Sequence, residues 1–208
     1  MQEWSQGASA GVWSECPRAA AALAVLLSFV PGWVLAAEPA DSALTGYVGR
    51  ITTVNAWHDI VAEPSEVEFA DAYLAALALS YTLARYREDA LSLETEGQVV
   101  YNYGDQSHWE FNGLLASRWH RFPWQESLAT TMAFGLGLSY ATEVPEVELQ
   151  LEGSSKQLRI YWLFEMTFAP ASSRWAASIR LHHRSKGFGL MADDGGMNAL
   201  AAGVRFEF

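Results

Sequence analysis

Residues 157–169 alternate between two kinds of side chain, and this period of two constrains the segment's fold. Apolar and aromatic side chains occupy the even-numbered positions, whereas the odd positions include Arg159, Glu165 and Thr167. Successive side chains of a β-strand point to opposite faces of the sheet, so the segment predicts a strand with two different faces. The even positions are Leu158, Ile160, Trp162, Phe164, Met166 and Phe168.

The same alternation recurs along the chain and predicts eight strands. Two segments carry a weaker pattern. Residues 71–86 are rich in Ala and Leu, which also favour a helix, and residues 45–54 depend on the β-branched run at 51–54. The predicted strands are residues 45–54, 71–86, 91–103, 109–119, 128–140, 157–169, 174–185 and 198–208.

The chemistry of the two faces decides the fold class. Charged residues make up 18% of the chain, against about 25% in an average protein. The apolar faces are dense in aromatic residues at the segment ends, the polar faces mix small residues with charges of both signs, and the last strand ends on Phe208. We therefore predict an all-β fold, an eight-stranded antiparallel transmembrane β-barrel in the outer membrane of a Gram-negative bacterium. A soluble β-sandwich is the alternative.

An even number of strands puts both termini of the chain on the periplasmic side. Short periplasmic turns are then expected at residues 86–89, 122–126 and 170–172, and outside loops at 56–69, 104–107, 142–155 and 186–197. After residue 36, no apolar run approaches the roughly 18–20 residues that a membrane helix needs.

The N-terminal segment predicts a secretion signal. Arg18 precedes the apolar stretch 19–30, a Pro-Gly pair breaks that stretch, and small residues follow. This order is typical of a signal peptide over residues 1–36, cut after residue 36 or 37, which leaves residues 37–208 as a single barrel domain. A buried or membrane-anchoring helix is the alternative.

Composition also excludes several kinds of site. The net charge is −11 without a cluster of Lys or Arg, which argues against a nucleic-acid partner. Cys16 is the single cysteine, so a disulfide framework and a cysteine zinc site are excluded. No ligand cluster suggests a metal or cofactor. We expect the charges on the polar faces to pair inside the barrel, and these are Glu94, Glu96, Glu110, Arg118, Arg159, Glu165, Arg180 and Arg205.

One constellation carries the residue types of nucleophilic catalysis. His183 and Ser185 continue the lipid-facing row of strand 174–185, and Asn198 falls on the lipid-facing row of the next strand, at the same end. The spacing of His183 and Ser185 separates them by about 7 Å along the strand. A serine nucleophile, a histidine base and a group that orients the histidine form a known catalytic set. Ordinary polar residues at the level of the lipid headgroups are the alternative.

The C-terminal sequence resembles the lipid A 3-O-deacylase (PagL-like) outer-membrane family. The resemblance covers about the last 30 residues and lies in LHHRSKGFGL at residues 181–190, DGGMN at 194–198 and GVRFEF at 203–208. It implies an eight-stranded barrel with a Ser-His-Glu triad on its lipid-facing surface. His183 and Ser185 match the base and the nucleophile of that family.

The chain departs from the family pattern at the acid. The family has Glu on the final strand. Counting back from the C-terminus puts Asn198 there, and counting forward from the serine puts Met197 there. Lys186 stands where the family has Asn or a small residue, and the nearest acids are Asp193 and Asp194.

The sequence thus leaves two functions open. The first is an acyl-ester hydrolase that removes the 3-O acyl chain of lipid A in the outer leaflet, with Ser185, His183 and Asn198 as its catalytic residues and no cofactor. The second is a non-catalytic outer-membrane barrel that stabilises the membrane or presents its loops to a partner.

Overall fold

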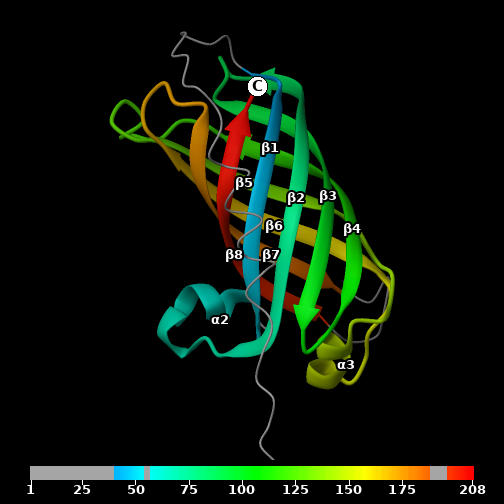
Figure 1. Ribbon diagram of the computed structural model, residues 1–208. Coiled ribbons are helices and arrows are strands. Elements are labelled where there is room, and N and C mark those ends of the chain that lie inside the picture. Colours follow the sequence, from blue (N-terminus) through cyan, green and yellow to red (C-terminus); the bar gives the residue numbers. More distant parts are fainter. Residues whose placement is uncertain (1–39, 54–56, 188–195) are drawn as a thin grey trace, which may run out of the picture. The chain divides into compact units, whose positions relative to one another are not determined.

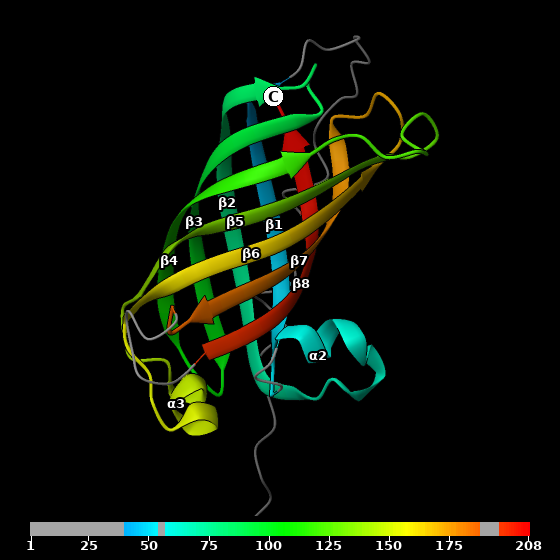
Figure 2. The same cartoon turned by 180° about the vertical axis from the view of Figure 1, so that it is seen from behind.

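The structure is a computed structural model that describes residues 40–53, 57–187 and 196–208. Within these ranges, eight antiparallel strands close into a barrel in which each strand pairs with its sequence neighbours and the first pairs with the last (Figures 1 and 2). The strands are β1 (Ser42–Thr52), β2 (Phe69–Tyr86), β3 (Leu91–Gly104), β4 (His108–Trp119), β5 (Ala129–Ala141), β6 (Leu158–Ala169), β7 (Trp175–Ser185) and β8 (Gly196–Glu207). The connections hold helix α2 (Trp57–Ala62), the 3-10 turn η1 (Pro64–Glu66) and helix α3 (Glu146–Glu152).

The eight predicted strands are confirmed, with small shifts at their ends. The first strand differs most, because β1 runs from Ser42 to Thr52 and has an irregular register between Arg50 and Thr52. The Ala- and Leu-rich segment is strand β2, since pairing on both sides satisfies its backbone and outweighs its helix propensity. The helices in the connections were not predicted. No helix among the described residues is long and apolar enough to cross a membrane.

The outer face of the barrel is apolar. Large hydrophobic side chains lie about half exposed on strands β1 to β7, and Ile179 on β7 reaches 58%. Water would penalise such a surface, whereas hydrocarbon would not. The barrel therefore spans a membrane, and the soluble sandwich is excluded.

Ion pairs fill much of the lumen, as expected. The Arg118 guanidinium lies 2.9 Å from a Glu94 oxygen and 2.8 Å from a Glu165 oxygen, and Arg180 lies 2.6 Å from the other Glu165 oxygen and 2.8 Å from Glu96. The buried arginines are Arg118, Arg159, Arg180, Arg184 and Arg205, and the buried glutamates are Glu94, Glu96, Glu110, Glu148 and Glu165. The five positive charges thus equal the five negative charges in number.

The remaining part of the lumen is apolar, which the sequence pattern did not predict. Tyr47, Ile51 and Leu74 form a buried cluster with Val100 and Met197. The alternation separates inside from outside, but it does not reveal how inward side chains from distant strands sort into charged and apolar zones.

The two ends of the barrel differ. One end, the loop end, carries α2 and α3, and the other, the turn end, carries the connections 87–90, 120–128 and 170–174 (Figures 1 and 2). Helix α3 reaches into the loop end, where a Glu148 oxygen lies 2.8 Å from the Arg159 guanidinium. The predicted signal peptide, residues 1–36, lies outside the described residues, so the domain boundary stays a prediction.

Candidate active site

The last two strands bring two of the three predicted site residues into contact. His183 on β7 and Asn198 on β8 are direct cross-strand partners on the outer face. Their neighbours His182 and Arg184 point into the lumen, where His182 bonds Glu110 and Tyr161. The face assignment made from the alternation is therefore correct at this end of β7.

A short hydrogen bond joins His183 and Asn198. The Nδ1 of His183 lies 2.6 Å from the Oδ1 of Asn198. An amide oxygen only accepts, so Nδ1 carries the proton and donates it, and this leaves Nε2 with a free lone pair. The histidine is thereby held in the tautomer that a general base requires.

Ser185 lies beside this pair without bonding to it. The Ser185 Oγ accepts a hydrogen bond of 3.1 Å from the backbone N–H of Gly187. Among the described residues, no hydrogen bond links Ser185 to His183. Of the three predicted site residues, His183 and Asn198 are therefore bonded to each other, whereas Ser185 is bonded to Gly187.

Gly196 on β8 lies next to the histidine and the serine. It pairs directly with Ser185 across the two strands. A Cβ atom added to Gly196 would lie 3.6 Å from Cε1 and 4.0 Å from Nε2 of His183. A side chain at position 196 would therefore lie in van der Waals contact with the imidazole of His183. Gly196 precedes the predicted start of the last strand, so sequence reasoning missed it.

The structure distinguishes Asn198 from Met197, the two positions at which the glutamate of the resembled family could fall. Asn198 lies on the outer face beside His183. Met197 points into the lumen, is 1% exposed and contacts Gln106. Asp193 and Asp194 lie outside the described residues.

Two aromatic side chains near His183 were not predicted as part of the site. The ring of Trp162 lies 4.5 Å from the imidazole of His183, and the ring of Trp57 on α2 lies 5.9 Å from that of Trp162. Trp162 could be found from the register, because it is the cross-strand partner of His183 on β6. Trp57 could not, since its position depends on the path of a loop.

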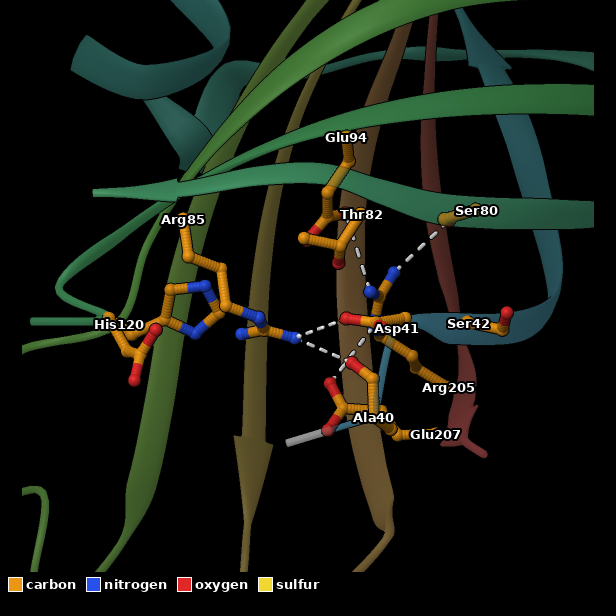
Figure 3. A pocket seen from close by; sticks show the side chains of 11 residues that line it. Ala40, Asp41, Ser42, Ser80, Thr82, Arg85, Glu94, His120, Arg205 and Glu207 are labelled. Carbon is orange, nitrogen blue, oxygen red and sulfur yellow. Dashed lines mark hydrogen bonds and ion pairs between the residues drawn. The ribbon is translucent and has the colours of Figure 1, made fainter. Parts of the chain in front are cut away.

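A separate polar cavity of about 200 Å³ lies at the turn end (Figure 3). Its charged side chains bind one another: Arg205 lies 3.3 Å from a Glu94 oxygen, and Arg85 lies 3.5 Å from an Asp41 oxygen. Burial, together with the nearby Arg118 guanidinium, lowers the pKa of His120, which also lines the cavity, to about 4. The cavity lies at the opposite end of the barrel from His183.

Metal ligands do not gather in the described part of the chain. No three His, Cys, Asp or Glu side chains lie close enough there to hold an ion.

Comparison with solved structures identifies the fold. No protein-family model and no curated protein sequence matches the chain. The crystal structure of the outer membrane enzyme PagL is similar with a TM-score of 0.55 and 10% identity, over 80% of this chain and 99% of that one. The protein is an eight-stranded outer-membrane β-barrel. Neisserial surface protein A gives a TM-score of 0.48 and 12% identity, over 83% of this chain and 100% of that one.

Proposed function

We propose that this barrel is a serine acyl-ester hydrolase that removes the 3-O acyl chain of lipid A at its lipid-facing surface. The observation that carries the proposal is the bond between His183 and Asn198, which orients the imidazole on the outer face next to Ser185. His183 lies on the outer face of the wall, so a reaction at this histidine would take place on the lipid side.

The reaction follows from the positions of the three groups. The Ser185 Oγ exchanges its bond to Gly187 for one to Nε2 of His183 and attacks the ester carbonyl as Nε2 takes its proton. The tetrahedral intermediate collapses, the sugar oxygen leaves with the proton from Nε2, and the acyl group stays on Ser185. Water, deprotonated by the same imidazole, then releases the fatty acid.

The location of the site fits a lipid substrate. Ser185 is the last residue of β7 at the loop end, and below it the outer face is apolar. The acyl chains of a glycolipid in the bilayer would lie along this apolar wall while its ester bonds stay near the headgroups. The loop end would then face the outer leaflet, where lipid A resides.

The amide at position 198 makes a slow enzyme the expected outcome. A neutral orienting group serves Cys-His-Asn sites, but it stabilises an imidazolium less than a carboxylate does. The second candidate, a non-catalytic barrel, is favoured by the present bond of Ser185, which goes to Gly187 instead of His183.

Mass spectrometry of lipid A decides between the two candidates. The protein is expressed in a Gram-negative host without a lipid A deacylase, alongside Ser185→Ala and Ser107→Ala. Ser107 is a matched control because it lies at the same end of the barrel, bonded to Tyr101 on another part of the wall. We expect loss of one 3-O acyl chain with the wild type and Ser107→Ala only. If the folded wild-type barrel leaves lipid A intact, the enzyme proposal is refuted and the non-catalytic barrel remains.

A further inference from the structure

The outer face around His183 is covered, unlike the outer face elsewhere at the loop end. Outward-pointing side chains at that end are about half exposed, for example Trp109 at 49% and Tyr140 at 47%. Across β7, β8 and β1, the corresponding values are 7% for His183, 1% for Asn198 and 1% for Thr52. These three side chains are therefore shielded from their surroundings, in part by the wall residue Trp162.

Helix α2 lies against this part of the wall. Both views show it outside the barrel, beside the loop ends of β1 and β8 (Figures 1 and 2). Its Trp57 ring meets the Trp162 ring edge-on at 5.9 Å, and Trp162 in turn contacts His183. Its Ile60 is 5% exposed. Trp57 and Ile60 are three residues apart, so they lie on one face of the helix.

The covered side chains of His183, Asn198 and Thr52 are polar, so a cover would keep them out of contact with lipid. Three side chains able to form hydrogen bonds lie side by side on a surface that otherwise faces hydrocarbon, and the Oγ1 of Thr52 bonds the Asn198 carbonyl at 3.4 Å. Polar groups directly exposed to lipid are costly. A shield over them removes that cost while no substrate is bound.

The cover is held weakly. Helix α2 has six residues, far fewer than an isolated helix needs for stability. Trp57 itself is 50% exposed, and tryptophan favours the membrane–water interface, where one side of the ring is apolar and the other wet. An element of this kind can leave the wall at small cost when another apolar group replaces it.

We propose that α2 is a displaceable cover over the His183–Asn198 pair, and that an acyl chain of the lipid substrate opens it by replacing Trp57 against Trp162. Trp57 is then a positioning residue: it acts on the histidine through Trp162 and touches no reacting atom. The identity of the displacing chain rests on the proposed function, whereas the cover itself rests on the burial and the ring contacts.

Chemical modification of His183 tests the cover without any need for activity. The folded barrel in detergent is treated with diethylpyrocarbonate, and fragment ions locate the modified histidine. His182 is an internal reference because it is adjacent in sequence and fully buried in the lumen. Trp57→Ala should raise the modification rate of His183 by roughly threefold to tenfold, the factor expected for one lost aromatic contact.

Two variants control this measurement. Trp109→Ala removes an equally exposed tryptophan from another part of the loop end and should leave the rate unchanged. Trp57→Phe keeps an aromatic ring and should restore most of the protection. Equal rates in wild type and Trp57→Ala, with both barrels folded, would overturn the cover.

Hydrolysis of a short-chain p-nitrophenyl ester separates this inference from the proposed function. If the cover and the enzyme are both real, Trp57→Ala hydrolyses this small ester faster than the wild type, because the ester cannot displace α2 itself. Faster modification with no hydrolysis in any variant would retain the cover and refute both the enzyme and displacement by its substrate. Ester hydrolysis together with an unchanged modification rate of His183 in Trp57→Ala would retain the enzyme and refute the cover.

Discussion

Replacement of Asn198 by aspartate should raise the rate of ester hydrolysis by about tenfold. The two side chains have the same shape, so the 2.6 Å contact with Nδ1 of His183 is retained and becomes charged. A neutral hydrogen bond contributes about 0.5–1.5 kcal/mol and one to a charged group about 1.5–3 kcal/mol. The difference, roughly 1–1.5 kcal/mol, stabilises the imidazolium of the transition state and corresponds to about one power of ten in rate.

The assay is the release of 3-hydroxy fatty acid from lipid A in mixed micelles, measured as kcat/KM. The double variant Ser185→Ala with Asn198→Asp shows whether the added turnover uses the serine. Asn112→Asp is the matched control, because it buries a new carboxylate in the lumen, away from His183. A folded Asn198→Asp barrel with turnover equal to or below the wild type would refute the assignment of Asn198 as the orienting group.

Three further outcomes are expected. Glu165→Gln deprives two buried arginines of a shared carboxylate and should lower the free energy of unfolding by about 3–5 kcal/mol. Glu88→Gln, at an exposed ion pair, should lower it by at most about 1 kcal/mol. Urea titrations measure both values. Gly196→Ala should fold but lower turnover, since its methyl group would lie against the imidazole of His183, 3.6 Å from Cε1 and 4.0 Å from Nε2. The pKa of His120 is lowered to about 4, so the unfolded chain, at about 6.5, binds the proton first. Stability should therefore fall from about pH 6.5 toward pH 4, and His120→Gln should weaken that dependence in urea midpoints.

The sequence was sufficient for the barrel wall because the period of two is a property of the extended backbone. It placed His183 and Asn198 on one face, and counting along the two strands placed them at the same end. The structure adds that they are direct partners, which depends on the register between strands. Met197 could be separated from Asn198 only when this register was known, since neighbouring residues of a strand point to opposite faces.

The loops were beyond the reach of sequence reasoning. Helix α3 begins after Pro145 without a side-chain cap that would announce it in the sequence. Glu148 looks like any acidic loop residue, yet it is buried against Arg159. The contact of Trp57 with Trp162 likewise depends on where the loop folds back, and local preferences do not determine that.

The packed lumen has an electrical consequence. Paired arginines and glutamates occupy its middle, so an ion would have to separate buried charge pairs to pass, and α3 adds Glu148 at the loop end. Reconstituted in a planar bilayer, the protein should show no unitary conductance steps at potentials where porins conduct. A cell could therefore carry many copies without making its envelope leaky.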